Sequence, residues 1–427
     1  LTTIFGRLYV NKQQEISRAP KLGSLALWRM GRIADKIKSD FNETFLPAFA
    51  KEMAVQEAID FDKLPTADLL DAVARIRANY MGATCVAASV VNIAADYYLR
   101  RARDKLTTEG IEPARVLAHA DQTEFERALA VAKEAPAASR ENVLLRGIGH
   151  RSTVDYELAA PRYAERPADA DPLLNVPDMP VRSLAEIGAD LAAHTDDAAL
   201  RQVVLVACSF QTLKEDAKHH SLRELAVLRR ALLAVDRRFM LDGLVFYLTF
   251  EELDALRDER AVANLRAAAL ARRQLAAGLA EVSSVDATLT VRQIEDYAMG
   301  IKPQSADGTD RMGGLRVSGS GRVEGRACVV KEAGADGGSV IPGFQDGDIV
   351  VSRMVPPAWL PYFKRAGGFV CEVGGWLSHT AIVAREFNVP LVVQAKGLQA
   401  IETGDLIRLD SDGAIEVVAQ RQTVEAA

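Results

Sequence analysis

Residues 374–386 read GGWLSHTAIVARE, and this stretch decides how the C-terminal part of the chain is expected to fold. Two glycines follow a β-rich run that ends at Cys371-Glu372, and an apolar helical pattern starts near His379. Glycine lets the backbone approach a bulky group closely. A helix N-terminus offers unpaired N–H groups and the positive end of its dipole, which together bind phosphate. The stretch therefore predicts a strand, a glycine turn and a helix that begins with a histidine.

An imidazole at that helix start is placed to attack a phosphorus atom with a neutral ring nitrogen. We expect the resulting phosphohistidine on His379 to be held by backbone N–H groups of the turn at Gly374 and Gly375. Ser378 and Thr380 are expected to add hydroxyl donors to the same phosphoryl oxygens. The alternative is that His379 only caps or packs against the helix, which is the commoner role of a lone histidine after a glycine turn.

Working outward, short β-rich runs surround this helix. They are Arg322–Val330, Asp348–Val351, Gly368–Glu372, Pro390–Val393, Leu406–Leu409 and Ala414–Val418. Turn pairs such as Asp346-Gly347 separate them. The pattern predicts a small α/β domain over residues 315–420, preceded by a polar, glycine-rich linker over 301–314.

This region resembles the swivelling phosphohistidine domain of phosphoenolpyruvate-utilising enzymes. That family includes phosphoenolpyruvate synthase, pyruvate phosphate dikinase, enzyme I of the sugar phosphotransferase system and rifampin phosphotransferase. The resemblance covers about Ser318 to Val418. It is carried by the glycine pair, Ser378-His379, the run AIVAR at 381–385 and the run NVP at 388–390. The resemblance implies that His379 is the residue that becomes phosphorylated.

The first 300 residues are expected to form a mostly α-helical domain, so the chain is predicted to be multidomain. Alanine-rich and leucine-rich stretches with interleaved charge predict helices over Leu25–Met53, Thr66–Thr107, Gln122–Lys133, Ala198–Asp236 and Phe250–Ala280. Thr66, Asp121 and Thr249 are predicted N-terminal caps, and Asp121 has Glu124 at the spacing of a capping box. Residues 147–180 interrupt this pattern with prolines and charges, and we expect a long ordered loop there.

That loop contains the first acceptor-site candidates, His150 and Arg151, in the run GHRSTVDYELAAPRY at residues 149–163. The run resembles the region that precedes the mobile domain in rifampin phosphotransferase, which implies that it forms a wall of the acceptor pocket. The alternative is an ordered loop whose arginine and aspartate side chains pair among themselves.

A second group of candidates lies on one predicted helix. Lys214 and Lys218 are four residues apart and share a face, and they resemble the basic-Glu-x-x-Lys helix of rifampin phosphotransferase. The resemblance implies that the pair stabilises charge on the transferred phosphoryl group. The alternative is a solvated basic face. His219 and His220 are candidates for the base that removes the acceptor's proton, and Arg223 is a further acceptor-site candidate, expected on a different face from the lysines.

Composition narrows the class of protein. The net charge of −6 and the pI of about 5.7 argue against a general nucleic-acid binder or a protein that binds anionic membranes. The four cysteines form no CxxC pair, so we expect neither disulfides nor a bound metal, and a reducing cytoplasm is the predicted location. The longest uncharged stretch, Ala78–Ala95, contains polar residues and predicts a buried helix rather than a membrane span.

The function implied is that of the catalytic subunit of a two-component dikinase-type phosphotransferase. We find no Walker motif or glycine-rich nucleotide loop, and expect neither an ATP-grasp domain nor a pyruvate-binding barrel in this chain. This arrangement resembles rifampin phosphotransferase without its ATP domain, and the split phenylphosphate and cresol-phosphate synthases. It implies an ATP-grasp partner subunit, Mg²⁺ with the ATP there, and a small phenolic acceptor that becomes an aryl phosphate. The alternatives are a rifamycin-type acceptor, or a phosphohistidine carrier that serves as a regulatory relay.

Overall fold

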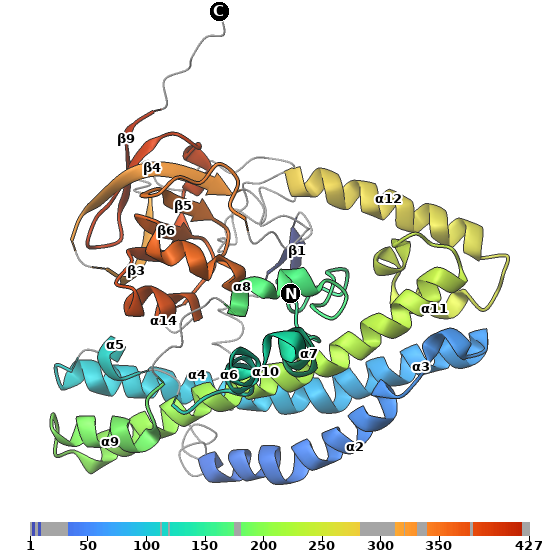
Figure 1. The fold of residues 1–427 in the computed structure, drawn as a ribbon, viewed down its shortest axis with the longest axis horizontal. Helices are drawn as coiled ribbons and strands as arrows, with labels where there is room; N and C mark the ends of the chain where they lie inside the picture. The colour runs from blue at the N-terminus through green and yellow to red at the C-terminus, as the bar shows by residue number, and fades with distance from the viewer. Residues whose placement is uncertain are drawn as a thin grey trace, which may run out of the picture. The chain divides into compact units, whose positions relative to one another are not determined.

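The protein's structure is a computed structural model that describes residues 2–4, 7–9, 33–111, 113–117, 120–174, 181–281, 312–319, 321–330, 340–375 and 379–420. The chain divides into two compact units (Figure 1). The helical unit comprises Gln13–Pro167 and Pro180–Leu275, and the α/β unit comprises Leu1–Lys12, Ala168–Met179 and Ala276–Ala427. The predicted fold class, a mostly helical region followed by a small α/β domain, is confirmed.

The helical unit is built around α10 (Ala198–Arg238), a helix of 41 residues. The other elements are η1 (Asp40–Phe45), α2 (Leu46–Glu57), η2 (Phe61–Lys63), α3 (Thr66–Asn79), η3 (Tyr80–Thr84), α4 (Cys85–Thr108), α5 (Pro113–Val116), α6 (Glu124–Glu134), α7 (Ala137–Ile148), α9 (Leu184–Ala192), η5 (Leu244–Tyr247) and α11 (Phe250–Ala255). The last helix, α12 (Val262–Glu281), runs past the unit's boundary. The Asp197 carboxylate caps α10 by accepting hydrogen bonds from two backbone N–H groups.

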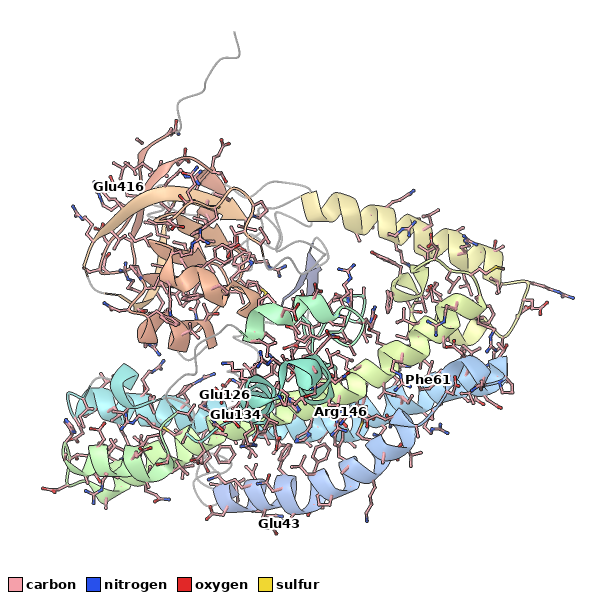
Figure 2. All side chains as sticks on the ribbon, in the orientation of Figure 1. Glu43, Phe61, Glu126, Glu134, Arg146 and Glu416 are labelled. Carbon is pink, nitrogen blue, oxygen red and sulfur yellow. The ribbon has the colours of Figure 1, made fainter. Side chains whose placement is uncertain are left out.

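Helix α10 buries one face against α3 and α4 over most of its length (Figures 1 and 2). Leu222, Leu228 and Val235 of α10 join Leu69 and Ile76 of α3 in one apolar core. Burial of such side chains stabilises the unit by roughly 1.5–3 kcal/mol each. The remaining faces of α10 stay available for polar side chains, and these build the site described below.

Three predicted helical stretches differ in detail from the structure. The run predicted over Leu25–Met53 contains the π-helical η1 and continues to Glu57, and its residues 25–32 lie outside the described residues. The run predicted over Thr66–Thr107 is continuous but contains the π-helical turn η3 between α3 and α4. The run predicted over Phe250–Ala280 is two helices, α11 and α12, separated by a short turn. Helices α7 and α9 were not predicted, because both are short and lie beside proline-rich segments.

One of the three predicted caps is correct. Thr249 caps α11 and forms a capping box with Glu252. The prediction of Asp121 as a cap is wrong, because Thr123, two residues further along, caps α6 and forms a capping box with Glu126. The prediction of Thr66 as a cap is also wrong, because Thr66 is the first residue of α3. Its hydroxyl accepts a hydrogen bond from Arg238 instead.

The α/β unit contains a seven-stranded sheet with the strand order β3-β7-β6-β5-β4-β8-β9. The strands are β3 (Gly313–Ser318), β4 (Val323–Val330), β5 (Ile349–Ser352), β6 (Gly368–Cys371), β7 (Leu391–Lys396), β8 (Leu406–Leu409) and β9 (Ile415–Ala419). The central strands β4 to β7 are parallel and the outer ones antiparallel. The unit also contains the hairpin β1 (Thr2–Ile4) and β2 (Arg7–Tyr9), together with η4 (Pro167–Asp169) and α8 (Asp171–Leu174).

Helix α14 (His379–Glu386) connects β6 to β7 and covers one face of this sheet with η6 (Pro357–Lys364). A second core lies on the other face, where Leu398 of η7 (Leu398–Ala400) packs. The six predicted strands match the observed ones to within a few residues. Strand β3 was missed, because its first residues fall in the predicted linker over 301–314. Residues 301–311 of that linker lie outside the described residues.

Candidate functional site

His379 is the first residue of α14, the helix that follows β6 in the sequence, as predicted. The fold therefore places the backbone of this residue at the positive end of a helix dipole, where anions are stabilised. Ser378, the predicted neighbouring hydroxyl donor, lies outside the described residues, and its role remains a prediction.

The glycine turn is tightly packed at one of its two glycines. A Cβ atom at Gly374 would lie 2.9 Å from a side-chain carbon of Val393, whereas Gly375 faces open space. Gly374 is therefore required for packing on β7, whatever its role toward a phosphoryl group. The Thr380 hydroxyl donates a hydrogen bond to the Val355 carbonyl at 3.2 Å, so donation to a phosphoryl oxygen requires this hydroxyl to rotate.

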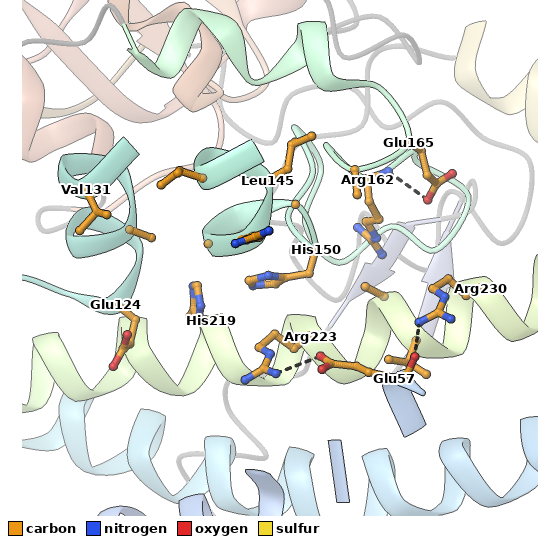
Figure 3. A pocket seen from close by; sticks show the side chains of 18 of the residues that line it. Glu57, Glu124, Val131, Leu145, His150, Arg162, Glu165, His219, Arg223 and Arg230 are labelled. Carbon is orange, nitrogen blue, oxygen red and sulfur yellow. Dashed lines mark hydrogen bonds and ion pairs between the residues drawn. The ribbon is translucent and has the colours of Figure 1, made fainter. Parts of the chain in front are cut away.

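The helical unit contains a pocket of about 980 Å³ (Figure 3). Its walls come from the end of α2, from α6, from α7 and the loop after it, and from α10. The lining residues used below are Glu57, Glu124, Arg127, Val131, Leu145, Arg146, His150, Arg162, Glu165, His219, Arg223, Val227 and Arg230. Three predicted acceptor-site residues, His150, His219 and Arg223, are thus brought together, although the first two are 69 positions apart in the sequence.

His150 and His219 form a contacting pair of neutral imidazoles. Their ring centroids are 4.4 Å apart, edge to face. Burial, and then the proximity of His219 and the charge of Arg151, lower the pKa of His150 well below its usual value. Burial, and then Arg151, lower the pKa of His219 to about 3. Nε2 of His150 and Nδ1 of His219 are buried without a partner among the described residues, so neither atom's hydrogen-bonding capacity is used within the described part of the chain.

Four other candidates are not among the described residues that line this pocket. The His220 ring packs against Phe49 with centroids 5.7 Å apart, and burial lowers the pKa of its imidazole. The Lys214 ammonium lies 3.4 Å from the carboxylate of Asp96. The remaining two, Lys218 and Arg151, meet at a single carboxylate.

That carboxylate belongs to Asp155, in the loop after α7. Arg151 donates two hydrogen bonds to it at 2.9 and 2.7 Å, and the Lys218 ammonium lies 2.9 Å away. Burial alone would raise the pKa of Asp155, but Arg151 and Lys218 outweigh it and hold this pKa below its usual range. Arg151 thus pairs within its loop, as the alternative interpretation of this segment held, and Lys218 fixes that loop to α10.

Two more buried arginines lie near this cluster and were not predicted. Arg229 donates to both carboxylate oxygens of Glu165, each at 2.7 Å. Arg162 is only 2% exposed, and its Nη1 donates to the Asp155 carbonyl at 2.8 Å. Burial, and then Arg229, lower the pKa of Arg162. Arg162 was quoted in the loop motif, but the motif gave no sign that its side chain turns into the pocket.

Among the described residues there is no group of three or more His, Cys, Asp or Glu side chains that could hold a metal ion. One described helical run, Thr66–Thr108, is long and apolar enough to cross a membrane by length and composition alone. The same run carries the π-helical turn η3 and packs against α10. A core helix of a globular protein can have the same length and apolar composition.

Part of the C-terminal unit is similar to a known protein family. Residues 344–413 match the family described as PEP-utilising enzyme, mobile domain. Rifampicin phosphotransferase of Streptomyces sviceus is 29% identical over 306 residues, which cover 64% of this chain and 33% of that protein. Prodigiosin synthesizing transferase PigC of Serratia marcescens is 27% identical over 302 residues, covering 65% and 33%. The chain therefore spans about a third of the length of these relatives.

A third relative, rifampicin phosphotransferase of Bacillus cereus, is 40% identical over 107 residues, which are 25% of this chain and 12% of that protein. The solution structure of Enzyme I (nEIt) aligns with 70% of this chain and 79% of its own at 16% identity, with a TM-score of 0.19 that is too low to bear on the fold. These matches show that residues 344–413 are similar to the mobile domain of PEP-utilising enzymes, and that the chain is similar to rifampicin phosphotransferases over part of their length.

Proposed function

We propose that this chain is the phosphohistidine-carrying, acceptor-binding component of an ATP-dependent phosphotransferase. The observation that carries the proposal is the position of His379, at the start of α14 in the matched mobile domain. The relation to rifampicin phosphotransferases supports transfer to a hydroxyl group. The pocket of about 980 Å³ in the helical unit supports an enzyme rather than a relay that only passes phosphate between proteins.

The proposed reaction has two steps. In the first, a ring nitrogen of His379 attacks the β-phosphorus of ATP bound, with Mg²⁺, to an ATP-grasp partner. The P–O bond to AMP breaks, and the γ-phosphate passes to water, so that AMP and inorganic phosphate are released. In the second, the acceptor's hydroxyl oxygen attacks the phosphorus, the P–N bond breaks, and the hydroxyl proton goes to a base. The mobile domain carries the phosphoryl group between the two sites.

In the helical unit, several polar groups suit the second step. The neutral rings of His150 and His219 each have an unpartnered nitrogen, which suits a hydrogen bond to the acceptor's hydroxyl group. The predicted cations Lys214 and Lys218 are proposed to meet the incoming phosphoryl group. The preferred acceptor is a small aromatic alcohol of the phenol or cresol type, which would leave as an aryl phosphate.

A rifamycin-type acceptor is the second candidate. The names of two relatives favour it, and so does the size of the pocket, since about 980 Å³ lies at the upper end of the range for drug-sized ligands.

The test is to incubate the chain with an ATP-grasp partner, Mg-ATP and each acceptor, and to follow products by phosphorus NMR and mass spectrometry. Aryl phosphate with one AMP per turnover supports the first candidate, and a phosphorylated rifamycin supports the second. If ADP is the nucleotide product, or if the product forms equally with His379→Ala, the proposed mechanism is wrong.

A further inference from the structure

Three buried arginines lie beside the pocket. They differ in the partner of one side of the guanidinium group, the edge that carries Nε and Nη2. Arg151 directs Nε and Nη2 at the two carboxylate oxygens of Asp155. Arg229 directs the same two atoms at the two carboxylate oxygens of Glu165. Both pairs have the two-point geometry in which a guanidinium binds a planar carboxylate most strongly.

In Arg162, the edge that carries Nε and Nη2 has no hydrogen-bond partner among the described residues. Its Nε and Nη2 are buried and make no hydrogen bond to any of the described residues, although its Nη1 is satisfied. The residue is 2% exposed and lines the pocket. Figure 3 shows its side chain to the right of His150, among the residues that line the pocket. A two-point donor without a partner in the described part of the chain is therefore buried within a side chain that lines the cavity.

Asp155 and Glu165 act electrostatically on the buried Arg162 guanidinium, but each of these carboxylates already binds another arginine, and the other carboxylates that line the pocket are paired as well. Glu57 pairs with Arg223 at 2.9 Å. Glu124 pairs with Arg127 at 3.0 Å. The third carboxylate that lines the pocket, that of Glu165, is taken by Arg229. None of these described carboxylates hydrogen-bonds to Nε or Nη2 of Arg162, so this side of the guanidinium can bind a carboxylate of a ligand.

The rest of the pocket defines the other end of such a ligand. The unpartnered His150 and His219 nitrogens suit an uncharged polar group such as a hydroxyl. Aliphatic side chains of Val131, Leu145 and Val227 line the same pocket and suit an apolar body. The ligand that fits has a carboxylate at one end, a hydroxyl at the other and an apolar part between them.

We propose that the pocket binds a hydroxylated carboxylic acid whose carboxylate is held by Nε and Nη2 of Arg162. This inference rests on the proposed function and narrows it, because it makes the acceptor an anion rather than a neutral phenol. A carboxylate is favoured over a phosphate since the two neighbouring arginines use this edge for planar two-oxygen groups.

The experiment is calorimetric titration of the full chain with 4-hydroxybenzoate, benzoate, phenol and inorganic phosphate. We expect both carboxylates to bind, 4-hydroxybenzoate more tightly, and phenol to bind at least tenfold more weakly than 4-hydroxybenzoate. If phenol binds as tightly as 4-hydroxybenzoate, if phosphate binds and the carboxylates do not, or if no probe binds, the proposal is wrong.

Variants test the residue itself. Arg162→Gln should weaken benzoate binding by about tenfold to a hundredfold, the loss typical of a charged hydrogen-bond pair. Arg162→Lys keeps the charge but loses the two-point edge, and should still lose about tenfold. Arg146→Gln is the matched control, because Arg146 lines the same pocket but is exposed; its affinity should change less than threefold. Equal losses in Arg162→Gln and Arg146→Gln would mean that only the general charge of the pocket matters.

This inference and the proposed function fail separately. His379→Ala should bind benzoate like the unmodified chain, since the pocket lies in the helical unit. If carboxylates bind through Arg162 but His379 is never phosphorylated, the inference stands and the proposed function falls. If His379 is phosphorylated and no carboxylate binds, the proposed function stands and the inference falls.

Discussion

Lys218 has an observed structural contact and a proposed role in phosphoryl transfer. It pairs with the buried Asp155 at 2.9 Å, and that carboxylate keeps Arg151 as a two-point partner when Lys218 is removed. Lys218→Ala should therefore still fold and still accumulate phospho-His379. It should pass the phosphoryl group on about a hundredfold to a thousandfold more slowly, because a cation that stabilises transition-state charge contributes roughly 2–4 kcal/mol.

A single-turnover chase separates loading of His379 from transfer to the acceptor. Lys63→Ala is a suitable control, since Lys63 is a largely exposed lysine whose partner, Asp60, is also exposed. A Lys218→Ala protein that loses loading and keeps transfer would place Lys218 at the partner interface. If neither step changes, Lys218 only holds the loop to α10.

His219 makes the stability of the helical unit depend on pH. Its folded pKa of about 3 lies below the ordinary value of roughly 6.5, so the unfolded state binds more protons between these values. The stabilisation is complete above about pH 6.5 and is lost as the pH falls. Between pH 7 and pH 5 this loss should be about 2 kcal/mol.

Urea unfolding at the two pH values measures this effect, and His219→Gln should remove it. The comparison with the variant is needed because Asp216, whose pKa burial raises to about 6, changes stability in the opposite direction over part of this range. His194→Gln, at a histidine outside the pocket lining, should keep the dependence of the unmodified chain. Parallel pH profiles for the His219→Gln and unmodified proteins would contradict the account.

At this scale, the sequence predicted residue types better than it predicted contacts. His150 and His219 were chosen independently as candidates and prove to be in contact. The junction at Asp155 joins a loop to a helix 63 positions away, and no local pattern reveals such a pairing. Arg162 was missed as well, because the lack of a hydrogen-bond partner for Nε and Nη2 of its guanidinium among the described residues is visible only in the tertiary structure.

At the scale of elements, the π-helical turn η3 is held by the buried Glu224 of α10. The Glu224 carboxylate accepts hydrogen bonds from Asn79 at 2.6 Å, Thr84 at 2.5 Å and Gln56 at 3.0 Å. Glu224→Ala would leave these donors without their acceptor. The free energy of unfolding should fall by roughly 3–5 kcal/mol, as when a buried polar network loses its centre.

Chemical denaturation of the full chain measures the loss. The control is Glu215→Ala, an exposed glutamate on the same helix, which should change stability by less than about 0.5 kcal/mol. If the Glu224→Ala protein is as stable as the Glu215→Ala protein, Glu224 does not hold η3 in the helical bundle.

The elements themselves were largely predictable where a pattern repeats. The hydrophobic periodicity of the β-rich runs and of the long amphipathic helices is visible in the sequence, so six strands and α10 were predicted. Strand β3 starts with Gly313-Gly314, residues typical of a linker, and a sheet neighbour decides its structure. Caps failed where two cap-forming residues lie close together, as with Asp121 and Thr123, because only the backbone path selects between them.

At the scale of the whole molecule, the chain is expected to depend on a partner for ATP. The isolated chain should not bind Mg-ATP, since its sequence offers no nucleotide-binding loop and its described residues offer no cluster of metal ligands. Calorimetric titration of the chain alone decides this, with an ATP-grasp protein as the positive control. Micromolar binding to this chain would mean that the helical unit has been misinterpreted.

The change in period of the hydrophobic pattern along the chain predicted a helical region followed by an α/β region. It did not predict that Leu1–Lys12 and Ala168–Met179 would group with the α/β unit. The pocket was not predictable, since its walls come from four helices and a loop that only the tertiary structure brings together.

The central claim is that His379 carries the phosphoryl group, and mapping an acid-labile label tests it most directly. The chain is incubated with its ATP-grasp partner and ATP labelled at the β-phosphate, and the labelled peptide is identified under alkaline conditions. The account predicts one label, on the peptide containing His379, and none in the His379→Ala protein. A label on another histidine, such as His219 or His220, or turnover by the His379→Ala protein, would contradict it.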